Sequence, residues 1–191
     1  MLQRLSPGQK APVFSAHDVF GNAISLVDSL HKYTLLAFMR YAGCPWCNLA
    51  IHRVALEYKL LTKSRCEVIA FVQSTPENIL KNIYQRHKEK PLFPIIADQT
   101  QTFYKLYGVR SSLSGSAKNI TQIPHWIHAV RAQGFRQANI DGKLLMVPAM
   151  FLVSEGQQVI VGADYQANFF NNETFTRIYQ KLVFGDVAEL G

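Results

Sequence analysis

Long apolar runs are missing from this chain of 191 residues. The longest such run, Tyr33 to Met39, is too short to cross a membrane, and the opening stretch MLQRLSPGQKAP lacks the apolar segment of a secretory signal. We therefore expect no membrane partner and a cytoplasmic location. Internal repeats, low-complexity tracts and signs of a second domain are also missing. A single domain over residues 1–191 follows as our expectation.

Acidic residues are scarce: 13 Asp and Glu stand against 20 Lys and Arg, which gives a formal charge of +7. The basic residues are scattered, and no basic stripe interleaved with aromatic residues accompanies them. The densest basic stretch, residues 81–90, is typical of the solvated face and last turn of a helix. We therefore expect no nucleic-acid partner.

Cysteine is scarce as well, with three residues in the chain. Three cysteines do not form a disulfide framework, and two of them, Cys44 and Cys47, form a Cys-x-x-Cys unit. In an apparently intracellular chain this spacing points to catalytic or metal-binding thiols. What the chain does have is a 48% apolar composition, which is enough for a full hydrophobic core.

The apolar periodicity predicts an α/β fold in which strands and helices alternate. Such alternation implies a central mixed sheet, with parallel strands and a C-terminal antiparallel hairpin, flanked by helices. The predicted strands are an N-terminal hairpin within 11–30, then 33–39, 68–72, 93–97, 144–147, 149–153 and 159–161. The predicted helices are 45–61, 76–88, 102–107, 124–133 and 173–183, with residues 111–146 forming an inserted helical and loop segment.

The two cysteines of Cys44-Pro45-Trp46-Cys47 lie where a buried strand turns into a helix. Their spacing lets the second thiol attack a species formed on the first, and the helix N-terminus stabilises a thiolate. The unperturbed cysteine pKa of about 8.5 can be lowered by one to several units in such a place. Cys44 and Cys47 are therefore the predicted catalytic residues, with Pro45 and Trp46 between them as supporting residues.

Two other interpretations of these cysteines stay open. A Cys-x-x-Cys unit is half of a zinc site, but the remaining cysteine, Cys66, has no His-x-x-x-His near it. Alternatively the pair is buried and inert, although a strand-to-helix junction is an exposed and electropositive place. We expect no metal and no cofactor, and we expect Cys66 to be a buried structural residue.

Arg40 and Pro148 are the further candidates for supporting roles. Arg40, four residues before Cys44, either stabilises a thiolate and polarises a peroxide oxygen or is a surface residue at the strand end. Pro148 interrupts a strand-like run, which suits either a cis bond that turns the chain beside the cysteines or a trans proline at a strand start. We expect His52 and His87 to be solvated or capping residues, without a role.

Four segments resemble the peroxiredoxin-like branch of the thioredoxin superfamily, which comprises alkyl hydroperoxide reductase and thiol-specific antioxidant proteins. They are GQKAPVFSAHDVFGNAISL, LLAFMRYAGCPWC, FPIIADQTQTFYKLYGV and VPAMFLVSEGQQVI, and together they extend over most of the chain. The resemblance implies a thioredoxin-like three-layer fold, and it places Pro148 at the cis-proline of that fold. It also implies antioxidant thiol chemistry and a chain that forms homodimers.

The chain departs from that family at its central motif. Typical peroxiredoxins have a proline seven residues and a Thr or Ser three residues before the peroxidatic cysteine, and an arginine from a later strand. Counting back from Cys47 gives Arg40 and Cys44, and the strand LLMV before Pro148 holds no arginine. The family pattern thus makes Cys47 the peroxidatic residue. In the thioredoxin pattern, by contrast, the first cysteine of the pair, Cys44, is the exposed nucleophile and Cys47 resolves it. Because Cys44 is nearer the helix N-terminus, we expect it to be the more acidic thiol and the nucleophile.

The sequence therefore predicts a thiol oxidoreductase that reduces a peroxide or a disulfide through a dithiol–disulfide cycle of Cys44 and Cys47. An external dithiol, such as a thioredoxin-type or glutaredoxin-type protein, must then reduce the disulfide. Two alternatives remain. One is a protein disulfide oxidoreductase without peroxidase activity, and the other is a non-catalytic binding module of thioredoxin fold.

Overall fold

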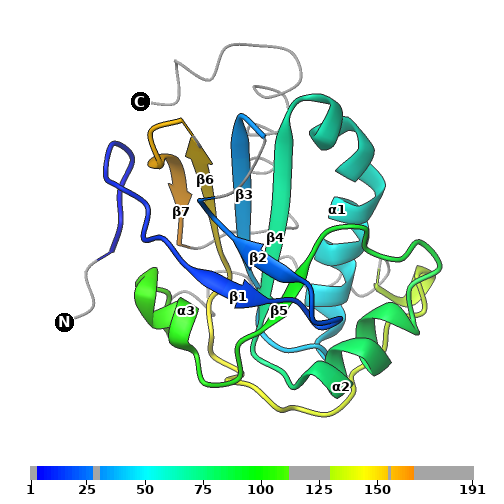
Figure 1. The fold of residues 1–191 in the computed structure, drawn as a ribbon. Helices are drawn as coiled ribbons and strands as arrows, with labels where there is room; N and C mark the ends of the chain where they lie inside the picture. The colour runs from blue at the N-terminus through cyan, green and yellow to red at the C-terminus, as the bar shows by residue number, and fades with distance from the viewer. Residues whose placement is uncertain (1–3, 28–30, 112–129, 155, 166–191) are drawn as a thin grey trace.

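A five-stranded mixed sheet forms the centre of the structure (Figure 1). The computed structural model describes residues 4–27, 31–111, 130–154 and 156–165. The strands lie in the order β5-β4-β3-β6-β7, where β3, β4 and β5 are parallel and β6 and β7 run antiparallel to their neighbours. Their bounds are β3 (Tyr33–Phe38), β4 (Cys66–Val72), β5 (Ile95–Ala97), β6 (Ala149–Ser154) and β7 (Val159–Asp164). This is the predicted mixed sheet with its C-terminal antiparallel hairpin.

Helices cover both faces of this sheet, and Figure 1 shows α1 and α3 on opposite sides of it. The helical elements are α1 (Pro45–Lys63), α2 (Pro76–Ile79), the π-helical turn η1 (Leu80–Tyr84) and α3 (Thr102–Leu106). A small antiparallel hairpin of β1 (Ser15–His17) and β2 (Ala23–Ser25) precedes the main sheet. The turn between these two strands carries the expected glycine, Gly21, at a φ of 85°.

Alternate residues of the wholly buried strand β3 enter two separate cores. Leu35 shares one hydrophobic cluster with Ile51 of helix α1. Its neighbour Leu36 shares the other cluster with Tyr104 of helix α3. Since successive side chains of a strand point to opposite faces, this division confirms the predicted three-layer arrangement.

The bounds of β4, β5 and β7 differ from the predicted ones by two or three residues, and two other predicted elements differ more. The helix predicted over 76–88 ends at Tyr84, and its second half is the π-helical turn η1, a form that usually extends over a single turn. Residues 144–147 do not form the predicted strand: the Met146 amide donates to the Lys143 carbonyl in a turn, and Met146 makes only an isolated bridge to Ser111. The next residue, Pro148, has no amide hydrogen with which to extend a ladder.

Parts of the sequence-based description lie outside the described residues. Residues 130–132 are helical, as predicted, but the rest of the helix predicted over 124–133 lies outside them. The same is true of the helix predicted over 173–183. The single domain over 1–191 and the insertion over 111–146 therefore stay predictions.

The loop before Cys44 and the bend at Pro148 meet at the carboxyl ends of the parallel strands. Phe38, the last residue of β3, pairs with Phe71 of β4 and with Ala149 at the start of β6. The loop that leads into Cys44 and the bend that contains Pro148 therefore share one edge of the sheet, where α/β folds place their sites. Within the described residues, no helix has the length and apolar character needed to cross a membrane.

Candidate active site

Helix α1 begins directly at the Cys-x-x-Cys motif. Cys44 is the N-cap residue, with an extended backbone (φ −77°, ψ 119°), and Pro45 is the first helical residue. Proline is well suited to that position because an amide hydrogen there would have no partner within the helix. Cys47 is thus the third residue of the helix. The predicted start at Pro45 is confirmed, and the helix runs to Lys63, two residues beyond the predicted end.

Both thiols of the motif are buried, contrary to our expectation of an exposed junction. Cys44 is 1% exposed and Cys47 is 3% exposed. Both belong to the hydrophobic cluster that helix α1 forms with the sheet. Residues 137–144, in the last part of the predicted insertion, pass over the loop before helix α1 and are called the covering segment. The Tyr41 hydroxyl donates to Gln137 Oε1 at 3.2 Å, and the Ala138 amide donates to the Gly43 carbonyl at 3.0 Å.

Residues 137–144 lie so close to this loop that only glycine fits at its centre. A Cβ atom placed on Gly43 would lie 2.5 Å from the carbonyl oxygen of Asn139. Gly142 is similarly constrained, since a Cβ atom there would meet the Gln73 carbonyl oxygen at 2.9 Å. Both glycines therefore permit a close approach of two backbone segments that lie far apart in the sequence.

Asp141 anchors this covering segment to the start of helix α2. Its carboxylate accepts hydrogen bonds from the Ser74 hydroxyl at 2.7 Å and from the Asn78 side-chain amide at 2.7 Å. Ser74 in turn accepts a bond from the Ala42 amide at 2.8 Å, within the loop that leads to Cys44. The covering segment and the cysteine loop are thus joined through one carboxylate and one hydroxyl.

The surroundings of Cys47 favour its thiolate. Burial by itself pushes the pKa of this thiol upward, but the hydrogen bond from the Cys44 thiol and the charge of Arg40 act in the opposite direction. The Arg40 backbone amide also donates to Cys47 Sγ at 3.3 Å, and the Arg40 guanidinium contributes a further hydrogen bond. Together these groups lower the pKa of Cys47 from 9.0 to about 6.

The opposite holds for Cys44, so the order of acidity expected from the sequence is wrong. Burial raises the pKa of the Cys44 thiol well above its ordinary value, and its hydrogen bond and charge interaction with Cys47 raise it further. The sequence argument considered only distance from the helix N-terminus. In the structure the cation and two hydrogen-bond donors converge on Cys47, while Cys44 is the donor of the pair.

Arg40 lies beside the Cys47 sulfur, where its charge lowers the pKa of that thiol; its role in the reaction stays a prediction. Its side chain is half-buried, and its Nη1 atom donates to the Leu144 carbonyl at 3.4 Å. That contact holds the guanidinium between the cysteine pair and the covering segment. Its Nε atom is buried and has no hydrogen-bond partner within the described part of the chain.

Asn48 and His87 are site residues that the sequence analysis missed. Asn48 follows Cys47 directly, and its side-chain amide donates to the Ala42 carbonyl at 2.7 Å and to the Cys44 carbonyl at 3.0 Å. His87 Nε2 lies 2.8 Å from Asn48 Oδ1. His87 is thus buried, not solvated or capping as predicted. An asparagine on the apolar side of the helix is the one signal in the sequence that indicates this contact.

Cys66 is buried, as predicted, at the other end of the sheet. It pairs with Tyr33 at the first residue of strand β3, whereas the cysteine motif follows the last residue. With regard to the zinc alternative, no group of three or more His, Cys, Asp or Glu side chains with the geometry for a metal ion occurs among the residues that the structure describes.

Comparison with protein families identifies the chain. The model of the AhpC/TSA family matches residues 7–161. The chain belongs to the AhpC/TSA family. Membership of this family makes it a thiol redox protein, as the sequence resemblance indicated. A search of curated proteins finds no match.

Solved structures show the same fold at low sequence identity. The peroxidoxin BcpB from Mycobacterium tuberculosis is 14% identical over 94% of this chain and 97% of its own, with a TM-score of 0.68. Peroxiredoxin Q from Xanthomonas campestris is 11% identical over 93% and 92%, with a TM-score of 0.63. A putative thiol:disulfide interchange protein DsbE from Chlorobium tepidum is 15% identical over 94% and 99%, with a TM-score of 0.61. These likenesses confirm the thioredoxin-like fold.

In this AhpC/TSA protein Pro148 lies where the resemblance placed it, but its geometry differs. Its neighbour Ala149 pairs with Phe38, so the proline is at the same sheet edge as the cysteine loop. No peptide bond in the described residues is cis, and the cis Val147–Pro148 bond that we considered is therefore wrong. Pro148 is a trans proline immediately before strand β6, where its missing amide hydrogen interrupts no ladder.

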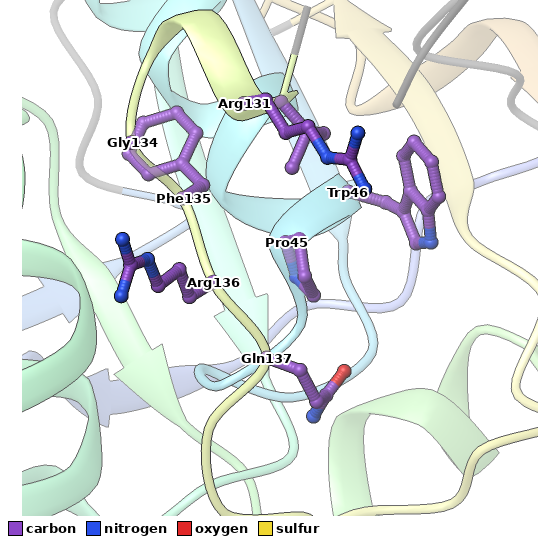
Figure 2. A pocket seen from close by; sticks show the side chains of 8 residues that line it. Pro45, Trp46, Arg131, Gly134, Phe135, Arg136 and Gln137 are labelled. Carbon is purple, nitrogen blue, oxygen red and sulfur yellow. The ribbon is translucent and has the colours of Figure 1, made fainter. Parts of the chain in front are cut away.

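A pocket of about 590 Å³ adjoins the cysteine motif of this AhpC/TSA protein (Figure 2). Pro45 and Trp46 form part of its wall, and Phe135 faces them from the segment before the covering residues. Figure 2 shows Arg131 beside Trp46 and Arg136 on the other side of Pro45. Aromatic rings and two cations thus surround an open space next to the two residues that separate the cysteines.

Proposed function

We propose that this AhpC/TSA protein is a thiol peroxidase in which Cys47 attacks the peroxide and Cys44 resolves the product. The observation that carries this proposal is the difference between the two thiols. Cys47 has a pKa of about 6 beside Arg40, whereas the pKa of Cys44 is raised. Because the thiolate is the nucleophile, Cys47 is charged and ready at neutral pH, and Cys44 is a protonated donor.

Each step of the cycle is balanced. The Cys47 thiolate attacks one peroxide oxygen, the O–O bond breaks, and the leaving alkoxide or hydroxide takes up a proton to give an alcohol or water. Cys47 is then a sulfenic acid. The Cys44 sulfur attacks this sulfenic sulfur, and the Cys44–Cys47 disulfide forms with release of water. An external dithiol reduces the disulfide through thiol–disulfide exchange.

The place of Arg40 supports the same assignment. In the family pattern an arginine from a later strand assists the peroxidatic cysteine, and this chain has none in residues 144–147, before Pro148. Here Arg40 stands seven residues before Cys47 and supplies a cation and hydrogen bonds to the same sulfur. Positive charge next to the thiolate also stabilises the negative charge that develops on the leaving oxygen.

The substrate and the partners belong to this proposal as well. The pocket beside Pro45 and Trp46 has room for the organic part of a peroxide or for a side chain of the reductant. A thioredoxin-type or glutaredoxin-type dithiol is the class of reductant that the chemistry requires. The homodimer implied by the family resemblance stays a prediction.

The deciding experiment is the second-order rate at which hydrogen peroxide consumes the thiols of the fully reduced protein. We expect a rate far above that of a free thiol for the wild type, and a rate no better than a free thiol for Cys47→Ser. Cys44→Ser should keep the first attack but stop after one turnover, with a sulfenic acid that dimedone captures on Cys47. A fast reaction that survives in Cys47→Ser and disappears in Cys44→Ser would reverse the two roles.

Disulfide exchange is the second candidate function, and the position of Cys44 favours it. Cys44 occupies the place where the family pattern has a Thr or Ser, so a second thiol replaces a hydroxyl beside the reacting sulfur. A wild-type rate with hydrogen peroxide equal to that of a free thiol, together with rapid reduction of a model disulfide, would establish this function instead.

A further inference from the structure

Both polar atoms of the Asn48 side chain are hydrogen-bonded, the nitrogen to the cysteine loop and the oxygen to His87. Its amide nitrogen donates to two carbonyls on that loop, those of Ala42 and Cys44, at 2.7 and 3.0 Å. Since both partners are acceptors, they fix which end of the amide is nitrogen. Its oxygen therefore faces the His87 ring, at 2.8 Å from Nε2. Asn48 is 1% exposed, so water does not replace these partners.

The contact with Asn48 determines the tautomer of His87. Because Asn48 Oδ1 can only accept, Nε2 of His87 carries the hydrogen and donates it. Nδ1 is then a bare acceptor, and it is buried without a hydrogen-bond partner among the residues that the structure describes. The ring also stacks against Phe135, with 4.7 Å between ring centroids. His87 thus gives one hydrogen bond, to Asn48, from an apolar environment.

This chain of contacts ends at the reactive sulfur. The loop that Asn48 holds carries two groups that donate to Cys47: the Arg40 amide, at 3.3 Å from Sγ, and the Cys44 thiol. We propose that Asn48 and His87 are positioning residues for Cys47, with His87 fixing the Asn48 amide and Asn48 holding both donors in reach of the sulfur. This inference rests on the proposed role of Cys47 as the reacting thiol.

Burial of two polar side chains costs free energy, which their hydrogen bonds offset only in part. The pair therefore indicates a role that apolar side chains could not fill. Burial lowers the pKa of His87 to about 4, so the ring is neutral near pH 7 and brings no charge close to Cys47. Its contribution is one directed hydrogen bond. Replacement of that bond by another donor of similar reach should therefore preserve the function of His87, whereas a side chain of similar bulk without a donor should not.

The test is the pKa of Cys47, read from the pH dependence of its alkylation by iodoacetamide, with peptide mapping to identify the modified residue. We expect Asn48→Ala and His87→Leu each to raise this pKa by about one, which lowers the thiolate fraction and the alkylation rate at pH 5 about tenfold. His87→Gln keeps a donor near the position of Nε2 and should restore the rate. His87→Leu should add nothing further in the Asn48→Ala background.

Asn82→Ala is the matched control, because Asn82 is another buried asparagine, 2% exposed, whose amide donates to the Asn78 carbonyl at 3.1 Å. It should lower stability without changing the pKa of Cys47. Unchanged Cys47 acidity in a folded Asn48→Ala protein, or equal loss in His87→Gln and His87→Leu, would overturn the proposal. If Asn48→Ala does not fold, the two His87 variants decide the question alone.

The same proteins separate this inference from the proposed function. A slow reaction of the wild type with hydrogen peroxide, together with the expected rise in Cys47 pKa in the variants, would refute the peroxidase and uphold the positioning pair. A fast wild-type reaction with no change of pKa in any variant would uphold the peroxidase and refute the pair.

Discussion

Cys47 and Cys66 are both buried, both part of one hydrophobic cluster, and yet differently equipped. Cys66 is the first residue of strand β4, at the amino ends of the parallel strands, and its Sγ donates to the Glu67 carbonyl at 3.4 Å. Cys47 lies at the carboxyl ends of these strands, and its Sγ accepts a hydrogen bond from the Arg40 amide. A sulfur that donates is a thiol, whereas a sulfur that accepts from several donors beside a cation is suited to be a thiolate.

The comparison teaches that burial alone does not decide whether a cysteine is inert. Removal from water disfavours a thiolate at either edge, because the charged form loses hydration. At the carboxyl edge that loss is more than offset, since the helix N-terminus, Arg40 and the Cys44 thiol surround one sulfur. Both thiols of the motif are also almost wholly removed from water, which strengthens each of these electrostatic contacts.

The largest expected difference between the two cysteines is in the pH dependence of stability. Cys47 has a pKa of about 6 in the folded protein and about 9.0 when unfolded, so between these values only the unfolded state binds the proton. Its contribution to the free energy of unfolding is complete above pH 9 and is lost as the pH falls through 6. The full shift corresponds to at most about 4 kcal/mol.

Urea unfolding of the reduced protein at pH 6, 7.5 and 9 measures this contribution. The wild type should gain stability over Cys47→Ser as the pH rises, while Cys66→Ser should follow the wild-type pH dependence. Cys44 has a raised pKa, so its folded form stays protonated in this window; it adds an opposing slope only near pH 9, where the unfolded thiol begins to lose its proton. Parallel curves for wild type and Cys47→Ser would show that the Cys47 thiol is not acidified.

The next largest expected effect is that of Arg40, which contributes part of the lowering of the Cys47 pKa. Arg40→Met removes the cation and the guanidinium hydrogen bond but keeps the backbone amide that donates to Cys47. The midpoint of the pH–rate profile with hydrogen peroxide should therefore move upward from about 6, and the rate at pH 6 should fall about tenfold. Arg40→Lys should be intermediate, since a lysine keeps the charge without the planar fork.

Arg110 provides the matched control for Arg40, because it is an exposed arginine at the end of the short turn after helix α3. Arg110→Met changes the net charge by the same amount and should leave the midpoint unchanged. An equal shift in both variants would mean that overall charge, not the contact with Cys47, sets the acidity of the thiol.

The sequence predicted the mixed sheet, with its parallel strands and C-terminal antiparallel hairpin, and the start of helix α1, because these depend on local apolar periodicity and on Pro45. It also located the cysteine pair. It did not predict which thiol is acidic, because the acidity depends on which sulfur the Arg40 groups and the Cys44 thiol approach, and the spacing of residues in the sequence does not give that geometry. His87 and residues 137–144 reach the cysteine loop only through contacts between distant parts of the chain. The close approach at Gly43 has the same origin: nothing beside it in the sequence indicates that Asn139 lies there.

The smallest expected effect is that of Cys66→Ala. About six strand residues separate the two edges of the sheet, which at about 3.3 Å per residue is roughly 20 Å, far beyond the reach of a disulfide. We therefore expect the peroxide rate and the number of turnovers with an external dithiol to stay within about twofold of wild type, and the free energy of unfolding to fall by about 1 kcal/mol for the small cavity. Single-turnover kinetics and urea unfolding on the same sample measure both quantities. Loss of turnover with an intact first attack would make Cys66 a second resolving thiol. The fold permits this role only if strand β4 separates from the sheet. The contrast between Cys47 and Cys66 would then be refuted.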